Sequence, residues 1–275
     1  MPTHPALKEG NVAVITGGAD GIGLAAAKHC RSLGMQVCIA DISEEKLAAA
    51  EAEVDGALAV VTDVSRREDL EKLRDAAYSA FGQVDVLMNN AGVGLPNTPW
   101  TEYEAWETIL GVNLWGVING LHAFTQAMID QGTPGAIINT GSKQGITTPP
   151  GNPAYNVSKS GVKSATEALA HSLRNTENCE ISAHLLVPGF TYTGMIRKFL
   201  PEQPPAAWSP EQVVEYLVTA MGNGDFYVLC PDNEVDRETD NKRMAWAMGD
   251  LIENRPALSR WHPDYESAFA RFMED

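Results

Sequence analysis

The fold is decided by residues 12–23, a stretch with the sequence VAVITGGADGIG. It begins with an apolar, β-branched run, as in a buried strand, and glycines then interrupt this run. The alanine-rich residues 24–33 that follow are typical of a helix. Glycines between a strand and a helix let backbone N–H groups approach a pyrophosphate, and the helix N-terminus adds a positive partial charge. The stretch therefore predicts a strand, a phosphate-binding turn and a helix.

The same alternation of apolar runs and helical segments continues along the chain. Residues 37–40 predict a second strand that ends at Asp41, and Ser43 is placed to cap a helix over residues 44–53. The pattern predicts further strands at 58–62, 84–89, 136–139, 181–187 and 226–230, and further helices at 67–81, 100–130, 153–174 and 210–221. These strands are apolar throughout rather than alternating, so we expect helices on both faces of the sheet. The predicted fold class is α/β, a doubly wound parallel sheet.

Size, charge and cysteine content limit the partners that we expect. A chain of 275 residues with 44% hydrophobic residues fits a single domain over 1–275. The net charge of -16 argues against a nucleic-acid partner, because binding to DNA or RNA needs clustered basic residues. No apolar run reaches the roughly 20 residues of a membrane span and no secretion signal is visible, so we expect no membrane partner and a cytoplasmic location. We expect no metal, and we expect free thiols at all four cysteines, Cys30, Cys38, Cys179 and Cys230.

Two segments depart from the pattern of the core, which spans residues 8–230. Residues 190–210 contain four prolines and predict a substrate loop or lid. Residues 231–275 are charged and helix-like, and they predict a C-terminal helical extension with Trp246, Trp261 and Tyr265 as packing anchors. Three roles stay open for this extension: it covers the active site, extends an oligomer interface or packs on the core.

Acidic residues near the predicted strand ends favour NAD as the cofactor. Asp41 can accept hydrogen bonds from both ribose hydroxyls of an adenosine and would repel the 2′-phosphate of NADP. Asp20, in the glycine turn, favours NAD for the same reason. Asp63 and Val64 follow the third strand, where adenine could lie, and residues 89–92, with the sequence NNAG, follow the fourth. Each of the last two segments could also be an ordinary polar turn.

A tyrosine and a lysine are placed one helical turn apart. Tyr155 and Lys159 have i, i+4 spacing on the helix that Pro153 opens, so their side chains should project from one face. A nearby ammonium favours the phenolate, so we expect a lowered Tyr155 pKa and a base that can accept an alcohol proton. Ser142 follows a predicted strand and could hydrogen-bond the substrate oxygen. Asn113 is unusual in an apolar helix, and it could equally be a buried structural amide.

Together these motifs resemble the short-chain dehydrogenase/reductase family over about residues 8–230. The resemblance rests on residues 16–23, 89–92 and 188–193, and on Asn113, Ser142, Tyr155 and Lys159. It implies a Rossmann-type fold in which those last four residues are the catalytic set. It also implies that Lys159 holds the nicotinamide ribose and that Asn113 supports a proton-relaying water. Family members assemble as dimers or tetramers, which here implies a homodimer or homotetramer through residues 101–130 and 153–174.

The resemblance also implies a binding site for NAD along the carboxyl ends of the strands. Ile22 would lie under the cofactor, Asp41 would bind the ribose, and residues 187–193 would position the nicotinamide. The implied cofactor-binding residues are Gly17, Asp20, Gly21, Ile22, Gly23, Asp41, Ile42, Asp63, Val64, Asn90, Ala91, Gly92, Tyr155, Lys159, Pro188, Gly189, Thr191 and Thr193.

The predicted pocket mouth is mainly apolar, which favours a bulky aromatic or alicyclic substrate. It comprises Leu95, Pro96, Trp100, Gln144, Ile146, Phe190, Tyr192, Met195 and Ile196. Lys143 and Arg197 could meet an anion there, but we expect Lys143 to face solvent. The main hypothesis is an oxidoreductase that transfers a hydride between a small-molecule secondary alcohol or ketone and NAD. Two alternatives stay open, an NADP-linked carbonyl reductase and a catalytically idle nucleotide-binding sensor or scaffold.

Overall fold

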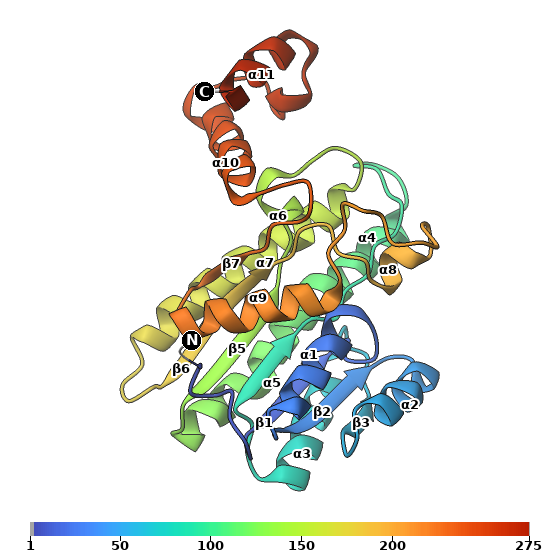
Figure 1. The fold of residues 1–275 in the computed structure, drawn as a ribbon, viewed down its shortest axis with the longest axis vertical. Coiled ribbons are helices and arrows are strands. Elements are labelled where there is room, and N and C mark those ends of the chain that lie inside the picture. The colour runs from blue at the N-terminus through green and yellow to red at the C-terminus, as the bar shows by residue number, and fades with distance from the viewer. Residues whose placement is uncertain (1–2, 275) are drawn as a thin grey trace.

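Seven parallel strands form one sheet at the centre of the molecule (Figure 1). The computed structural model describes residues 3–274 and gives the strand order β3-β2-β1-β4-β5-β6-β7. The strands are β1 (Val12–Thr16), β2 (Gln36–Asp41), β3 (Leu58–Val61), β4 (Val86–Asn89), β5 (Gly135–Thr140), β6 (Ile181–Val187) and β7 (Tyr227–Leu229). The strand order reverses between β1 and β4, and open sheets of this kind bind ligands beyond the carboxyl ends of the strands at such a point. The predicted doubly wound, Rossmann-type sheet is confirmed.

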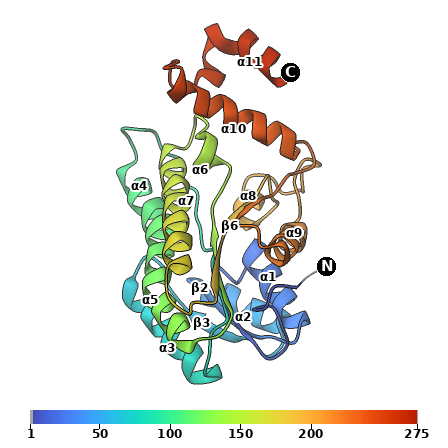
Figure 2. The same cartoon turned by 90° about the vertical axis from the view of Figure 1, so that its left-hand side faces the viewer.

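Helices cover both faces of the sheet (Figure 2). The buried residues of α1 (Gly21–Ser32), α2 (Glu44–Glu53) and α9 (Pro210–Asn223) pack on one face. Those of α3 (Arg67–Phe81), α5 (Gly116–Gln131) and α7 (Pro153–Arg174) pack on the other. The inner strands β2, β1, β4, β5 and β6 are mainly buried on both sides, which explains why their sequences are apolar without alternation, whereas the edge strand β3 is only partly buried.

Local capping fixes where α7 begins. Asn152 is its N-cap, and the Asn152 side chain accepts a hydrogen bond of 3.2 Å from the backbone N–H of Tyr155. Pro153 occupies the first turn, where its missing N–H has no cost. These two residues set the direction in which Tyr155 and Lys159 leave the helix.

The predicted helix over residues 100–130 is interrupted in the structure. It consists of α4 (Tyr103–Leu110) and α5, joined by the π-helical segment Gly111–Trp115. Two single-turn helices, α6 (Gln144–Thr147) and α8 (Gly194–Arg197), were not predicted. Such short segments carry no apolar periodicity, so the sequence pattern could not reveal them.

The C-terminal extension is helical and projects from one end of the body (Figures 1 and 2). It contains α10 (Arg237–Ile252) and α11 (Glu266–Glu274), with short 3₁₀ turns between them. Trp246 is its buried anchor: the indole N–H donates to Ser259 Oγ at 2.8 Å, and the ring packs edge-on against Phe269. The prediction of a second anchor at Trp261 is wrong, because that side chain is exposed.

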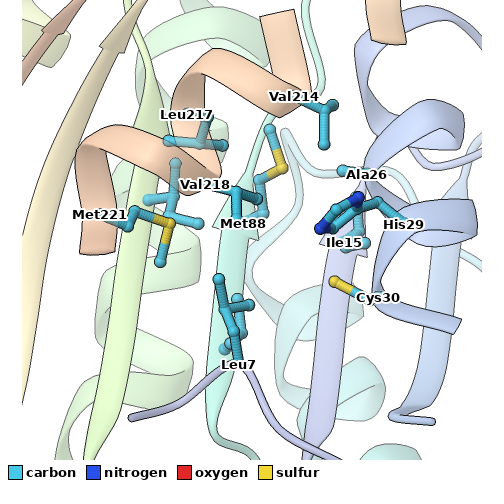
Figure 3. A pocket seen from close by; sticks show the side chains of 12 residues that line it. Leu7, Ile15, Ala26, His29, Cys30, Met88, Val214, Leu217, Val218 and Met221 are labelled. Atoms are coloured by element: carbon cyan, nitrogen blue, oxygen red, sulfur yellow. The ribbon is translucent and has the colours of Figure 1, made fainter. Parts of the chain in front are cut away.

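A small void remains between α1, α9 and the sheet (Figure 3). Its volume is about 20 Å³, and apolar side chains such as Leu7, Met88, Leu217 and Met221 line it. This space is close to the roughly 10–15 Å³ that one water needs. We interpret it as a packing defect of the core rather than a binding site.

Two further observations bear on the sequence-based expectations. The four cysteines are free, and burial raises the pKa of Cys30, Cys38 and Cys230 to about 12. Between residues 3 and 274, no helix combines the length and apolar character that crossing a bilayer requires.

Candidate active site

The turn between β1 and α1 has room only for glycine at two positions. Gly17 has φ +63°, and a Cβ there would lie 2.8 Å from the Cα of Ala91. A Cβ at Gly23 would lie 2.2 Å from the carbonyl oxygen of Gly17. The backbone can therefore curl tightly at the N-terminus of α1, and this shape fits a pyrophosphate.

Asp20 is engaged by two cations, which the sequence did not reveal. Its carboxylate caps α1 by accepting from Gly21 N at 2.7 Å, and it pairs with Lys46 at 3.1 Å and with Arg197. Burial alone would raise the Asp20 pKa, but the hydrogen bonds from Lys46 and Arg197 outweigh burial and lower it. Asp20 therefore cannot act as the free charge that repels a 2′-phosphate, and discrimination depends on Asp41.

The ends of β2 and β3 form the next part of the cleft. Asp41 Oδ1 accepts from Ser43 N at 3.2 Å, and the neighbouring Ile42 is 67% exposed despite its apolar side chain. Asp63 accepts two bonds from Ser65, at 3.0 and 2.7 Å, so this segment is also a polar turn. Val64 is buried against α5, and its carbonyl oxygen accepts from Asn119 Nδ2 at 3.0 Å, so its backbone N–H is the group that could meet a ligand.

Residues 90 and 91, which follow β4, hydrogen-bond the ends of the neighbouring strands. The Asn90 side chain donates to Thr16 O at 3.2 Å and accepts from the Thr140 hydroxyl at 3.2 Å. Ala91 N donates to Thr16 Oγ1 at 3.2 Å. Asn90 therefore connects β1, β4 and β5, and its amide is already used by the protein.

Ser142, Tyr155 and Lys159 lie together beside this cleft. The Lys159 Nζ is 5.7 Å from the centre of the Tyr155 ring and donates to Thr140 O at 2.7 Å. Lys159 is only 4% exposed. The Ser142 side chain lies close enough to Tyr155 to lower its pKa, and Ser142 Oγ accepts from Gln144 N at 3.2 Å. The predicted association of these three side chains is therefore present in the structure.

Burial changes the acidity of both Tyr155 and Lys159. It raises the Tyr155 pKa, and the hydrogen bond with Ser142 opposes this rise only in part. Burial also lowers the Lys159 pKa to about 8. The expectation of a lowered Tyr155 pKa is therefore wrong for this structure, because the phenolate loses more hydration than its neighbours replace.

Asn113 is fully buried within the π-helical segment. Its side chain accepts from Val93 N at 2.8 Å and donates to Val93 O at 3.0 Å. The Asn113 amide thus has the structural role that the sequence left open. A Cβ at Gly92 would lie 3.4 Å from Asn113 Oδ1 and 3.8 Å from Lys159 Nζ, so this glycine separates the two side chains. π-helical segments are rare and often mark functional sites.

The loop after β6 folds back over the phosphate-binding turn. A Cβ at Gly21 would lie 3.1 Å from Thr193 Cβ, and Arg197 of α8 reaches Asp20. Thr191 is buried, and its hydroxyl donates to Gly189 O at 3.1 Å. Of the implied cofactor residues in 188–193, Thr193 therefore lies against the glycine turn, whereas Gly189 lies against Pro231 and Asp232.

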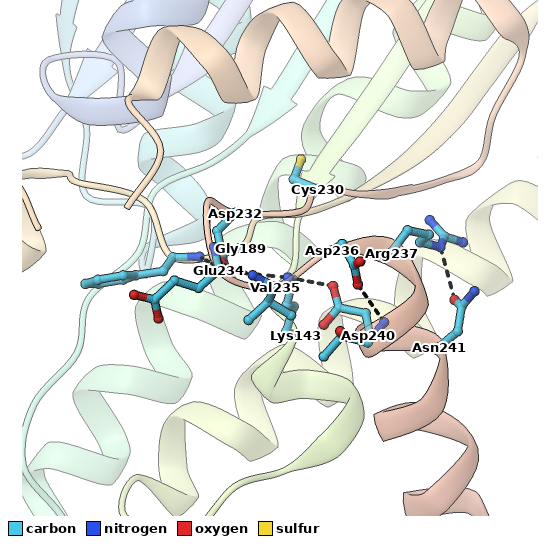
Figure 4. A network of polar contacts seen from close by, with 12 residues as sticks. Lys143, Gly189, Cys230, Asp232, Glu234, Val235, Asp236, Arg237, Asp240 and Asn241 are labelled. Atoms are coloured by element: carbon cyan, nitrogen blue, oxygen red, sulfur yellow. Dashed lines mark hydrogen bonds and ion pairs between the residues drawn. The ribbon is translucent and has the colours of Figure 1, made fainter. Parts of the chain in front are cut away.

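Lys143 does not face solvent, which corrects the sequence-based expectation. Its Nζ lies 2.6 Å from Asp240 Oδ2 and 3.6 Å from Asp232 Oδ2, and all three side chains are largely buried (Figure 4). Asp232 Oδ2 also accepts from Phe190 N at 3.2 Å. This network joins the loop after β5, the loop after β6 and the C-terminal extension.

Sequence reasoning missed both acids of this network. Asp232 follows the last strand closely, so the rule that ligand-binding groups follow strand ends could have identified it. Asp240 lies within α10, and its pattern resembles an ordinary solvated helix face. No local signal could have identified Asp240, because its partner comes from a distant part of the chain.

The predicted pocket-mouth residues are only partly assembled. Met195 Sδ would lie 3.4 Å from a Cβ at Gly94, so α8 contacts the loop after β4. The Tyr192 hydroxyl donates to Leu200 O at 3.2 Å, which ties it to its own loop. Trp100 is exposed.

Known proteins resemble this chain over most of its length. Residues 11–204 match the family model for short chain dehydrogenases. The chain is 35% identical to 3beta-hydroxysteroid dehydrogenase 2 of Eggerthella lenta over 198 residues. This match covers 70% of this chain and 75% of that protein. The chain is 34% identical over 262 residues to the CLA biosynthesis dehydrogenase/reductase of Lactiplantibacillus plantarum, covering 92% and 88%. A short chain dehydrogenase/reductase from Burkholderia phymatum in complex with NAD has a TM-score of 0.81 and 32% identity, covering 91% of this chain and 96% of that one.

Proposed function

This chain belongs to the short-chain dehydrogenase/reductase family of oxidoreductases, and from that membership we propose that it oxidises secondary alcohols to ketones with NAD. The observation that carries the proposal is the association of Ser142, Tyr155 and Lys159 beside the glycine turn. We assign acid–base catalysis to Tyr155, substrate orientation to Ser142 and charge stabilisation to Lys159. Asn113 supports this group through the segment after β4.

The proposed reaction separates a proton from a hydride. The Tyr155 phenolate takes the hydroxyl proton of the alcohol, and the Ser142 hydroxyl donates a hydrogen bond to the same oxygen. Bound NAD would supply the acceptor for the hydride that leaves the carbinol carbon. With a pKa of about 8, Lys159 is still an ammonium at neutral pH, and this cation, 5.7 Å from the ring centre, opposes the rise that burial causes in the Tyr155 pKa.

Asp41 is the basis for proposing NAD rather than NADP. Its carboxylate ends β2 beside the exposed Ile42, where an adenosine ribose would meet it. The solved relative from Burkholderia phymatum is a complex with NAD, which supports this choice. Lys46 could attract a 2′-phosphate, but it is paired with Asp20 at 3.1 Å.

We propose a bulky aromatic or alicyclic substrate. The support is the apolar character of residues such as Phe190, Met195 and Ile196 around the cleft, and the hydroxysteroid activity in the name of the Eggerthella lenta relative.

A homodimer or homotetramer through residues 101–130 and 153–174 is also part of the proposal. Trp115 and Val157 on these segments are apolar and exposed, which fits a buried contact between subunits.

The test is a steady-state assay of NADH formation with matched alcohols. We expect 1-phenylethanol and cyclohexanol to give a higher kcat/KM than 2-butanol, and NAD to be used at least tenfold better than NADP. Asp41→Ala should reduce this cofactor preference, since it removes the repulsion of the 2′-phosphate. A preference for 2-butanol would contradict the substrate proposal, and a preference for NADP would contradict the cofactor proposal.

A further inference from the structure

A hollow of about 60 Å³ lies between the loop after β5 and the C-terminal extension. Its walls come from α6, α10 and the turn beyond α10, and they include Lys143, Ile146, Thr147, Arg243, Met244 and Arg260. One water needs only about 10–15 Å³ of such space. The hollow can therefore hold a group larger than a single water molecule.

Two cations on these walls form no direct ion pair, although the Asp240 carboxylate also lines the hollow. Lys143 is held by Asp240 and Asp232, as Figure 4 shows. In the part of the chain from residue 3 to 274, neither Arg243 nor Arg260 forms an ion pair. The Nε of Arg243 is buried there without a hydrogen-bond partner. This is unexpected in a chain whose net charge is -16, since acids to pair with are abundant.

The two guanidinium groups are close enough to repel each other. Burial and then the charge of Arg243 lower the Arg260 pKa, although Asp240 opposes this. Arg260 is held in place by aromatic rings, with its Cζ 4.8 Å from the centre of Trp261 and 5.2 Å from that of Phe269. A group stacked in this way keeps its N–H edge free for a planar anion.

We propose that this hollow binds the carboxylate of a small molecule, with Arg243 and Arg260 as its ligands. A carboxylate is planar and matches the paired N–H donors of a guanidinium. It would neutralise two charges that now repel each other, and it would supply the missing acceptor for Arg243 Nε.

The carboxylate can come from either of two molecules. α6 directly follows the loop that carries Ser142, so the first source is the distal end of the alcohol itself. This version rests on the proposed function and narrows the substrate to bulky secondary alcohols that bear an acid group. The second source is a separate carboxylate that binds beside the reacting alcohol.

Equilibrium binding tests the site without any assumption about catalysis. Benzoate and biphenyl-4-carboxylate are titrated by calorimetry into the native protein, Arg243→Gln, Arg260→Gln and Arg237→Gln. Arg237 is the matched control, because it is exposed on the same helix and hydrogen-bonds only Asn241 among the described residues. We expect at least one acid to bind the native protein and Arg237→Gln equally, and to bind the other two variants at least tenfold more weakly.

Three binding results would overturn the proposal. They are no binding of either acid to the native protein, equal binding to all four proteins, and a change of oligomeric state in Arg243→Gln without any binding of acid. The last result would mean that a partner subunit fills the hollow. Thermal melting of each variant checks its folding, and the two arginine variants serve as replacements for each other if one does not fold.

Kinetic assays then distinguish the two sources. If the acid belongs to the substrate, 4-(1-hydroxyethyl)benzoate or its biphenyl homologue has a KM at least tenfold below that of its methyl ester, and Arg243→Gln removes this difference with little change in kcat. If the acid is separate, benzoate changes the rate of 1-phenylethanol oxidation without competing with the alcohol. The absence of both effects in the native protein would contradict the proposal. Oxidation of 1-phenylethanol itself tests the proposed function independently.

Discussion

Tyr155 shows how far residue spacing alone can predict chemistry. The spacing correctly placed Lys159 beside it, at 5.7 Å from the ring centre. The sign of the Tyr155 pKa shift could not be predicted, because it depends on how much water the folded chain removes. The Lys159 pKa of about 8 means that this ammonium loses its proton in mildly alkaline solution.

Ser142 should control the pH dependence of alcohol oxidation. Its hydrogen bond lowers the Tyr155 pKa against the effect of burial. Oxidation needs the deprotonated tyrosine, so Ser142→Ala should move the rising limb of kcat/KM to higher pH and reduce its plateau by about 10²–10³-fold. Ser142→Thr keeps a hydroxyl and should restore part of the native profile. An unchanged midpoint in Ser142→Ala would contradict this role.

Gly23 should tolerate no side chain. Gly23→Ala places a Cβ 2.2 Å from Gly17 O, so the turn must open. We expect a loss of about 1–3 kcal/mol in the free energy of unfolding, measured with urea, and a much weaker fluorescence titration with NADH. Gly111→Ala is the control, because a Cβ there meets only Ser65 Cβ at an ordinary 3.5 Å. Native NADH affinity in Gly23→Ala would be the contrary result.

At the scale of the element, α7 was predictable from the sequence, whereas the contacts of α10 were not. The N-cap Asn152 and Pro153 mark the start of α7 locally, and the observed bounds match the predicted ones. The position of α10 depends on the Lys143–Asp240 pair, which joins distant segments. Local signals therefore predicted the strands, the glycine turn and the Tyr155 helix, while the closing contacts of the site required the fold.

The ion pair between Lys143 and Asp240 should stabilise the junction of α6 and α10. Lys143→Met leaves a buried carboxylate without its cation, which typically costs about 3–5 kcal/mol of unfolding free energy. Lys143→Met/Asp240→Asn should recover part of this loss, because the Asp240 charge is removed while the buried Asp232 carboxylate remains. Urea denaturation of both variants measures the difference, and equal stability of the two would contradict the pairing.

The same pair has a pH signature. Burial raises the Asp240 pKa, although Lys143 opposes the rise, so removal of Lys143 should raise that pKa further. When folding raises the pKa of a carboxyl group, the free energy of unfolding falls as the pH rises above the pKa that the group has in the unfolded protein. The deficit of Lys143→Met should therefore be smallest in acid and grow toward neutral pH.

A hydrogen-bonded chain ties the N-terminal segment to β6. His4 Nε2 lies 3.0 Å from Ser182 Oγ, His184 Nε2 lies 2.8 Å from the same oxygen, and His184 Nδ1 lies 2.7 Å from Asp225 O. Ala6 N donates to His4 Nδ1 at 3.1 Å, so His4 is neutral here and donates from Nε2 to Ser182 Oγ. Burial, followed by the charge of His184, lowers the His4 pKa to about 4.

The hydrogen bonds of His4 with Ser182 and of Ser182 with His184 should make the stability of the protein sensitive to acid. The unfolded His4 binds a proton below its usual pKa of 6.5, whereas the folded one resists until about pH 4. Stability from this source should therefore be complete above pH 6.5 and decline as pH falls toward 4. His4→Gln should reduce the slope of the thermal midpoint against pH in that range. The same slope in both proteins would show that His4 is not involved.

At the scale of the whole molecule, the sheet, the cleft and the extension form one connected arrangement. The glycine turn follows β1 and residues 90–92 follow β4, so both lie where the strand order reverses, the point at which Rossmann-type sheets bind ligands. Asp232 links the loop after β6 to the extension, and Lys143 links the extension to the loop that carries Ser142. These contacts connect the loop that carries Ser142, the loop after β6 and the C-terminal extension at one end of the sheet.

The most direct test of the central claim is NADH binding and turnover by Tyr155→Phe. This change removes the hydroxyl that exchanges the proton but keeps the ring that packs beside Lys159. We predict native affinity in a fluorescence titration with NADH, together with a fall of about 10²–10⁴-fold in kcat for 1-phenylethanol oxidation. Native turnover by Tyr155→Phe would contradict the account, because the proton would then be accepted by another group.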